Sequence, residues 1–388
     1  HFYVSMRILI LTQPLHYNHG GLIQAYALPT VLRRMGHDVV TDRNGATPKS
    51  LWYRISHFVY HAIRFYILKD YRYYPYRYLF LSFNKENIAL KSIGTNMRNF
   101  VDTHIATIPF FEKNTKTWSN KAQFFDAIVV GSDQVWRATM SDIPVYFLSF
   151  TEGLQMKRIA YAASFGTDNL DEYSKVDLKA ASKYIKLFDA VSVREDSGAQ
   201  ICRYFFKMNV AHVLDPTMLL TKDDYLKLIE DEDKTHSLDM LLTYVLDRTQ
   251  EKKEIIQKIS GALHLKPREN GAAKYFSNVI EDDFSECVYP SVSKWLAGFR
   301  DAQFVVTDSF HGMVFSIIFN KPFIVILNTE RGASRFNSLL SMLHLENRMI
   351  SIGEDLSENL LVPIDYAPIN KILDGWKSKS VDYMRQYL

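Results

Sequence analysis

A carboxylate, a hydroxyl and an imidazole stand close together in one short polar stretch, and groups of these types bind anions and move protons. The stretch consists of Asp308, Ser309, Phe310, His311 and Gly312. The apolar, β-branched residues before it predict a buried strand over 304–307, and apolar residues at helical spacing after it predict a helix. A second apolar run over 323–327 completes a β-α-β unit.

In such a unit the carboxyl end of the first strand meets the amino end of the helix, where ligands of parallel α/β sheets bind. The helix end offers unpaired N–H groups and a partial positive charge, which suit an anion. Ser309, His311 and Gly312 are therefore candidate binding residues, and the imidazole of His311 is a candidate catalytic group. The alternative for Asp308 and Ser309 is that they only cap the helix.

Three other predicted strands end in small or polar residues followed by hydrogen-bonding or charged groups. The strand "AIVV" runs into Ser132, Asp133 and Gln134, the strand "RIAYAA" ends beside Ser164, and "AVSV" runs into Arg194 and Glu195. Any one of these ends is more typical of a cap than of a site. Because the carboxyl ends of parallel strands meet at one edge of a sheet, the three together outline the floor of a cleft.

The first predicted strand, residues 7–11, is followed by a glycine-bearing loop and a helix. Asn18, Gly20, Gly21 and Gln24 stand at this strand-to-helix turn, where a substrate can approach the backbone closely; the alternative is a plain tight turn. Neither GxGxxG nor GxxxxGK[ST] occurs, so no dinucleotide or P-loop nucleotide site is assigned.

The composition is that of an ordinary globular protein, and 388 residues favour two α/β domains. The formal net charge of +3 favours no class of charged partner, and no nucleic-acid-reading motif is present. Two cysteines cannot build a disulfide framework, so a reduced, cytoplasmic setting is expected. No apolar run reaches about 18 residues, and no secretory signal is recognised. Met6 is the expected natural start.

The segment Leu51 to Phe83 is rich in Tyr and Phe and carries basic residues against a single acid, Asp70. Such a composition suits peripheral contact with the inner face of the cytoplasmic membrane or with a sugar chain, and equally an insertion that packs on the sheet. We expect a Rossmann-like domain over residues 6–195 with this basic aromatic helical insertion near 51–100. A second such domain is expected over 196–365, followed by a C-terminal helix over 366–388 that returns to the first domain.

Several of these segments are similar to those of a known family. "NHGGLIQAYAL", "FDAIVVGSDQVW", "AASFG", "VSVRE", "VLDPTMLL" and "TDSFHG" occur in the order seen in polysaccharide pyruvyl transferases, from about Met6 to Leu345. The resemblance implies two Rossmann-like domains facing a central cleft, as in GT-B glycosyltransferases. It implies the transfer of pyruvate from phosphoenolpyruvate to two hydroxyls of a surface-polysaccharide sugar, as a ketal, with release of phosphate. No metal and no organic cofactor are implied.

The resemblance also implies roles for particular residues. His311 and Arg194 match positions associated with binding phosphoenolpyruvate, but many members have Arg-Leu-His where this chain has Ser309-Phe310-His311. Arg331 or Arg335 would have to supply the missing cation. Donor binding is thus assigned to Arg194, Ser309, His311, Gly312 and Arg335, and the acceptor or cleft to Asn18, Gly20, Gly21, Gln24, Ser132, Gln134, Trp136 and Ser164.

The reaction requires an acid that protonates the methylene carbon of the donor and a base that takes a proton from the sugar hydroxyl. His311 is the candidate acid, and Asp133 or Glu195 the candidate base; either carboxylate would alternatively only orient Arg194. We expect these groups to converge on a crevice of positive character. Two other functions remain open at this point, a glycosyltransferase that uses a nucleotide sugar and a non-catalytic glycan-binding subunit of polysaccharide assembly.

Overall fold

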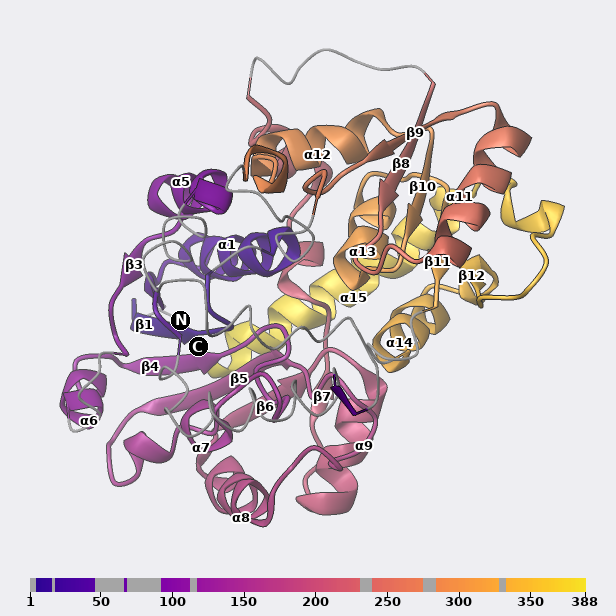
Figure 1. Ribbon diagram of the computed structural model, residues 1–388. Coiled ribbons are helices and arrows are strands. Elements are labelled where there is room, and N and C mark those ends of the chain that lie inside the picture. Colours follow the sequence, from indigo (N-terminus) through magenta and orange to yellow (C-terminus); the bar gives the residue numbers. More distant parts are fainter. Residues whose placement is uncertain are drawn as a thin grey trace.

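The computed structural model describes residues 5–15, 18–45, 66–67, 92–111, 117–230, 239–274, 284–327 and 333–388. Apart from residues 66–67, the basic aromatic segment over 51–83 lies outside the described residues. Two parallel sheets carry the fold, which confirms the predicted α/β architecture with two domains (Figure 1). None of the described helices is both long and apolar enough to cross a membrane.

The first sheet has seven parallel strands, and its order changes direction between the neighbouring strands β1 and β4. From edge to edge the strands are β3 (Thr107–Ile108), β2 (Asp38–Asp42), β1 (Arg7–Leu11), β4 (Ala127–Val130), β5 (Lys157–Ala163), β6 (Ala190–Val193) and β7 (Ala211–His212). The strand β7 follows residue 195, so this sheet extends beyond the domain boundary expected there. A strand of two residues is too short for a sequence pattern to reveal.

Alternate residues of the first sheet enter two different cores, so both of its faces are covered, as parallel sheets require. Ile8 and Ile10 of β1 belong to the core shared with α1 (His19–Arg34) and α5 (Thr95–His104). Leu9 and Leu11 belong to the core on the opposite face. The helices following β3, β4, β5 and β6 are α6 (Trp118–Ala122), α7 (Ile143–Tyr146), α8 (Lys175–Tyr184) and α9 (Asp196–Phe205).

The second sheet has five parallel strands, and its order changes direction between β8 and β10. The strands are β12 (Met349–Ile350), β11 (Phe323–Ile326), β10 (Phe304–Thr307), β8 (Met240–Tyr244) and β9 (Lys266–Glu269). Its helices are α11 (Gln250–Leu263), α12 (Val292–Asp301), α13 (Phe310–Ile318) and α14 (Ser334–Met342). The β-α-β unit predicted around His311 is thus β10, α13 and β11.

Two helical elements connect the halves. The short helix α10 (Lys222–Leu226) lies between the sheets in the chain, with Thr221 as its N-cap. The long helix α15 (Tyr366–Tyr387), yellow in Figure 1, runs from the second sheet to the first. The Tyr366 hydroxyl lies 2.6 Å from the carbonyl of Lys321, and the Lys157 ammonium lies 2.6 Å from the carbonyl of Tyr387. The largest apolar core accordingly contains residues of both halves.

Candidate active site

Arg194 lies at the centre of a buried cluster of charges at the carboxyl edge of the first sheet. Its guanidinium donates from Nη1 to Oδ2 of Asp215 at 2.7 Å and from Nη2 to Oδ1 of Asp133 at 2.9 Å. Its Nε lies 3.7 Å from Oε2 of Glu195, and its side chain is 0% exposed. Asp133 follows β4, Arg194 and Glu195 follow β6, and Asp215 follows β7. Residues that follow β4, β6 and β7 therefore converge on one cation.

The second sheet contributes His311, in the first turn of α13. The Nε2 of His311 lies 3.8 Å from Oδ2 of Asp215, with the imidazole side chain only 7% exposed. Within the described part of the chain this nitrogen has no hydrogen-bond partner. Arg194 and His311 therefore share Asp215, and the predicted convergence of strand ends from the two halves is present.

Gly20 allows the ring of His311 to lie directly on helix α1. A Cβ atom built on Gly20 would lie 2.2 Å from Nδ1 of His311, a distance that no side chain can occupy. At Gly21 the nearest atom to such a Cβ would be 3.6 Å away, in Asn18, which is ordinary contact. The requirement for glycine is thus specific to position 20 and arises from the packing of the second half against the first.

Charge and burial act against each other at the carboxylates. Burial alone would raise the pKa of Asp133, but the charges of Arg194 and His311 outweigh it and hold that pKa below its ordinary value. Burial is likewise outweighed at Asp215, where His311 and then Arg194 hold the pKa well below its ordinary value. Burial raises the pKa of Glu195, and the charge of Arg194 offsets this only in part. Glu195 is therefore a better proton acceptor than the two aspartates.

A second guanidinium reaches the cluster from α14. Arg194 and Arg335 both lie over the ring of Phe310, at 4.5 and 5.8 Å from its centroid. Burial, followed by repulsion from Arg194, lowers the pKa of Arg335 to about 10, so the group stays charged at neutral pH. Arg335 thus lies beside the cluster, and its role as the replacement cation stays a prediction. Arg331 lies outside the described residues.

The cluster in the structure does not have the excess of positive charge that the sequence predicts for the crevice. Two guanidiniums face three carboxylates, and those carboxylates enclose Arg194. The sequence could not reveal this enclosure, because the partners of Arg194 lie 61 and 21 residues away in the chain.

Gln24 and Ser132 join the polar floor beside this cluster. Oε1 of Gln24 accepts from the backbone N–H of Ser132 at 3.1 Å and from its hydroxyl at 2.9 Å. Nε2 of Gln24 donates to the hydroxyl of Thr12 at 2.7 Å. The Ser132 hydroxyl lies 3.4 Å from Asp215. The carboxyl ends of β1 and β4 and the start of α1 are thereby fixed to the site.

Two of the candidate residues, Asn18 and Ser309, act as helix caps. Oδ1 of Asn18 accepts from the N–H of Gly21 at 3.3 Å, and the hydroxyl of Ser309 accepts from the N–H of Gly312 at 3.4 Å. Gly312 packs against Thr307, whose hydroxyl would lie 2.2 Å from a Cβ at that position. For Ser309 the capping alternative is therefore what the structure shows.

The remaining candidates are Trp136 and Gln134, whose side chains contact residues outside the cluster, and Ser164, which contacts Glu195. Trp136 is fully buried in the core, where it stacks on Phe147 and donates from its indole nitrogen to the carbonyl of Tyr146 at 3.1 Å. The side chain of Gln134 accepts from Arg137 at 3.0 Å. Ser164 is buried and neighbours Glu195, for which it is a hydrogen-bond partner.

Asp215 and His19 are the residues that the sequence interpretation missed. Asp215 stands before a proline in the segment "VLDPTMLL" and is not among the candidate residues, although a carboxylate at a strand end is the signal used elsewhere in the chain. The ring of His19 stacks on Trp295 and its Nε2 lies 2.9 Å from the carbonyl of Pro290, in the other half. Nothing in the local sequence indicates that second contact.

No group of three or more His, Cys, Asp or Glu is arranged to hold a metal ion within the residues that the structure describes. The chemistry that the cluster itself offers is anion binding by Arg335, His311 and the start of α13, together with proton transfer by His311 and Glu195.

Comparison with solved structures identifies the fold. A protein described as a UDP-N-acetylglucosamine 2-epimerase from Listeria monocytogenes superposes with a TM-score of 0.51 at 11% identity, over 99% of this chain and 92% of that chain. A UDP-GlcNAc 2-epimerase from Methanocaldococcus jannaschii gives 0.48 at 8% identity, over 98% and 99% of the two chains. An alpha-glucosyltransferase in complex with UDP-glucose and DNA gives 0.47 at 10% identity, over 99% and 96%. The fold is that of GT-B glycosyltransferases and epimerases.

Comparison at the level of sequence identifies the family. A search of curated proteins gives no match. A family model described as polysaccharide pyruvyl transferase matches residues 18–330, which include all the residues of the buried cluster except Arg335. Because this match covers most of the chain, the protein belongs to the polysaccharide pyruvyl transferase family.

Proposed function

We propose that the protein transfers pyruvate from phosphoenolpyruvate to two hydroxyls of a sugar in a surface polysaccharide or its precursor, forming a ketal and releasing phosphate. The observation that carries the proposal is the position of His311, at the amino end of α13, beside Asp215 and near the two guanidiniums over Phe310. Phosphoenolpyruvate carries a phosphate and a carboxylate, and such a cluster of donors suits two acidic groups.

The proposed roles follow from the contacts. Arg194 is enclosed by carboxylates, so its part is to hold Asp133 and Asp215 in place. Arg335 and the start of α13 bind the acidic groups of the donor. His311, oriented by Asp215, gives a proton to the methylene carbon of phosphoenolpyruvate. Glu195, whose pKa burial raises, takes the proton of the sugar hydroxyl as its oxygen adds to the neighbouring carbon. The oxygen of a second hydroxyl then bonds to the same carbon as the carbon–oxygen bond to phosphate breaks, and the proton of that hydroxyl leaves with the phosphate, which closes the ketal.

The test uses the purified full chain with phosphoenolpyruvate and a panel of hexosides and oligosaccharides. We expect release of inorganic phosphate together with the mass gain of a pyruvate ketal on one class of acceptor. Changing His311→Ala should lower turnover by about 100-fold or more, the scale typical of a general acid or an electrostatic group, with the circular dichroism spectrum unchanged. Full activity of the variant would contradict the assigned site.

The same assay separates the two other functions. A glycosyltransferase would consume a nucleotide sugar and bind the nucleoside diphosphate, and it would leave phosphoenolpyruvate intact. A non-catalytic glycan-binding subunit would bind the saccharide and release neither product. Similarity to proteins that bind UDP-sugars shows the fold alone, so it does not favour the first of these.

The acceptor that we propose is a growing saccharide, lipid-linked at the cytoplasmic face of the membrane, and the protein would work in the cytoplasm. The basic aromatic residues over 51–83 would then contact lipid or glycan. Neutralising Arg54, Arg64 and Arg72 together should abolish co-sedimentation with anionic vesicles, if the segment binds membranes. A wild-type protein that does not sediment with vesicles would instead make the segment a structural insertion.

A further inference from the structure

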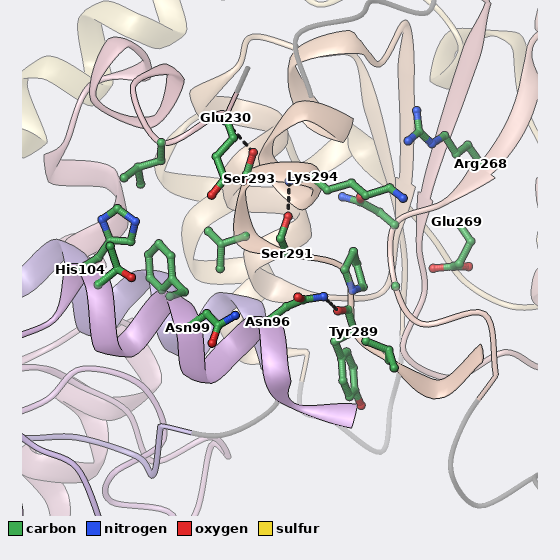
Figure 2. A pocket seen from close by; sticks show the side chains of 18 residues that line it. Asn96, Asn99, His104, Glu230, Arg268, Glu269, Tyr289, Ser291, Ser293 and Lys294 are labelled. Carbon is green, nitrogen blue, oxygen red and sulfur yellow. Dashed lines mark hydrogen bonds between the residues drawn. The ribbon is translucent and has the colours of Figure 1, made fainter. Parts of the chain in front are cut away.

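A pocket of about 780 Å³ opens between the two halves, away from the buried charge cluster (Figure 2). Helix α5 of the first half forms one wall, with Asn96 and Asn99 facing the pocket. The end of β9, with Arg268 and Glu269, and the first turn of α12, with Lys294, form the other. The floor is closed by a contact between the halves, since Nδ2 of Asn96 donates to the carbonyl of Tyr289 at 2.8 Å.

The chemistry of the lining is polar on both walls. Amide, hydroxyl and charged side chains provide both hydrogen-bond donors and hydrogen-bond acceptors. Two basic side chains, Arg268 and Lys294, and two acidic ones, Glu230 and Glu269, line the pocket. A fatty chain would leave these polar groups without partners, and a strongly anionic ligand would meet two carboxylates. A neutral ligand with many hydroxyls satisfies both kinds of group, and a saccharide is the common biological example.

The wall of the pocket is connected to the proposed reaction centre through the first turn of α1. The carbonyl of Pro290, a residue of the pocket wall, lies 2.9 Å from Nε2 of His19. The next residue, Gly20, lies directly against His311. Two consecutive residues of α1 therefore connect the pocket wall to the residues assigned to the chemistry.

We propose that this pocket is a saccharide subsite, which holds part of the acceptor chain next to the sugar that receives pyruvate. The assignment of the saccharide as an acceptor rests on the proposed function, whereas saccharide binding itself does not. The saccharide chain would contact both α5 and the wall formed by β9 and α12. The subsite therefore selects acceptors with several sugar units over single sugars.

The experiment measures binding and kinetics on the full chain with the pocket filled. Asn99 is exposed on α5, and Asn99→Trp would place an indole in the pocket. The matched control is Gln257→Trp, an exposed amide on α11 that does not line the pocket. A second pair is Lys294→Ala against Lys179→Ala, both exposed helical lysines. The probe is the surface polysaccharide of the producing cells, cut to oligosaccharides by mild acid, which also removes acid-labile ketals.

Saturation-transfer NMR and calorimetry should show oligosaccharide binding to the wild type and both controls. We expect Asn99→Trp to weaken it by about tenfold or more, which corresponds to about 1.4 kcal/mol. In the transfer assay the same variant should raise KM for the oligosaccharide and leave KM for phosphoenolpyruvate unchanged, which also shows that it is folded. If circular dichroism shows that Asn99→Trp is unfolded, the same binding and kinetic measurements on Lys294→Ala and its control Lys179→Ala test the subsite instead.

Equal affinity of the pocket variants and their controls for the oligosaccharides would overturn the subsite, as would a wild type that binds none of them. Failure of the proposed function has a different signature. In that case the wild type releases no phosphate from phosphoenolpyruvate, while loss of oligosaccharide binding in Asn99→Trp still supports the saccharide pocket.

Discussion

Asp215 lies beside both candidate side chains, Arg194 and His311, that the two halves bring to the site. Its Oδ2 accepts from Arg194 at 2.7 Å and faces Nε2 of His311 at 3.8 Å, and its Oδ1 accepts from the hydroxyl of Thr217 at 2.7 Å. Because Thr217 holds the carboxylate of Asp215 in place, this carboxylate fixes the position of the His311 imidazole relative to the first sheet. Asp215 therefore acts as a positioning residue between the guanidinium and the proposed acid.

The two adjacent glycines at the start of α1 provide a matched test of the contact with His311. Gly20→Ala would place a Cβ 2.2 Å from Nδ1 of His311, so the ring must move. We expect turnover to fall by about 100-fold, since displacements near 1 Å have that effect on catalytic geometry. Gly21→Ala has room for its methyl group and should keep full activity, with a gain in stability of about 0.5–1 kcal/mol from the better helix former. Steady-state kinetics and urea unfolding of both variants measure this, and equal activity of the pair would contradict the contact.

The partly buried carboxyl group of Glu269 should make the stability of the protein depend on pH. Burial, only partly offset by the charge of Arg248, raises the pKa of Glu269 from 4.5 to about 7. Between these values the folded state binds the proton more tightly than the unfolded state, so the stabilising contribution is complete below about pH 4.5 and is lost as pH rises through about 7. The neighbouring groups are Arg248, 3.4 Å away, the hydroxyl of Thr243 and the charge of Asp308.

Glu269→Gln should remove the part of the pH dependence of stability that Glu269 causes. We expect the free energy of unfolding of the wild type, measured relative to Glu269→Gln by urea titration, to fall steadily from pH 4.5 to pH 7 and then to level off. The difference between the two proteins isolates this carboxyl group from the other titrating residues. Parallel pH profiles would show that Glu269 ionises normally in the folded protein.

The residue types at the site follow from the sequence better than their roles do. A polar residue directly after an apolar run is visible in a single sequence, and Asp133, Arg194, Glu195 and His311 all lie together as expected. Whether such a residue caps a helix, as Ser309 does, or faces another charge depends on partners far away in the chain. Asp215 was not predicted as a site residue, because its contacts with Arg194 and His311 likewise depend on partners far away in the chain.

At the scale of elements, a buried ion pair holds the amino end of α11 against the end of β10. Nζ of Lys252 lies 2.6 Å from Oδ2 of Asp308, and both side chains are almost fully buried. The same carboxylate accepts from the backbone N–H groups of Leu246 at 2.6 Å and Asp247 at 3.0 Å. Asp308 therefore joins β8, α11 and β10 immediately before the helix that carries His311.

Removing the lysine leaves a buried carboxylate without its counter-charge. We expect Lys252→Met to lower the free energy of unfolding by roughly 3–5 kcal/mol, as is typical when one partner of a buried pair is lost. The neighbouring Lys253 is exposed on the same helix, and Lys253→Met should stay within about 0.5 kcal/mol of the wild type. Urea unfolding measures both. The double variant Lys252→Met/Asp308→Asn should recover part of the loss, and a double variant as unstable as the sum of its single changes would contradict the pairing.

The strands of the two sheets were predictable where they are buried on both faces. Runs such as residues 127–130 and 304–307 are continuously apolar because helices cover both sides of a parallel sheet, and β4 and β10 have those bounds. The two-residue strands β3, β7 and β12 offer no such pattern, since two residues show no periodicity. Their pairing is fixed by the neighbouring strand and not by their own sequence.

At the scale of the whole molecule, the two halves share one continuous apolar core, and α15 runs along both. The contacts that align them across the site are few and specific, with Gly20 against His311 and His19 against Trp295. These pairs are separated by more than half of the chain, so no local pattern predicts them. The proposed donor site and the proposed acceptor pocket each contain residues of both halves. Both therefore depend on this alignment.

His19 is the side chain that tests the alignment most directly. Its ring stacks on Trp295 with centroids 5.3 Å apart, and the edges of Tyr244 and Tyr289 lie at 6.4 and 6.1 Å. Burial lowers the pKa of His19 to about 4, so at neutral pH the ring is uncharged and its Nε2–H donates to Pro290. His19→Ala would empty an aromatic cage in the second half and remove this hydrogen bond.

We expect His19→Ala to increase the radius of gyration in small-angle X-ray scattering, because the halves lose an anchor, and to lower turnover in the transfer assay. The matched control is His37→Ala. His37 is also buried, but its ring contacts the backbone N–H of Met6 within the first half. Both variants should lose stability, by roughly 1–3 kcal/mol as is common for buried substitutions. Only the first should change the scattering, so equal radii for the two variants would mean that the shared core and α15 alone hold the halves in register.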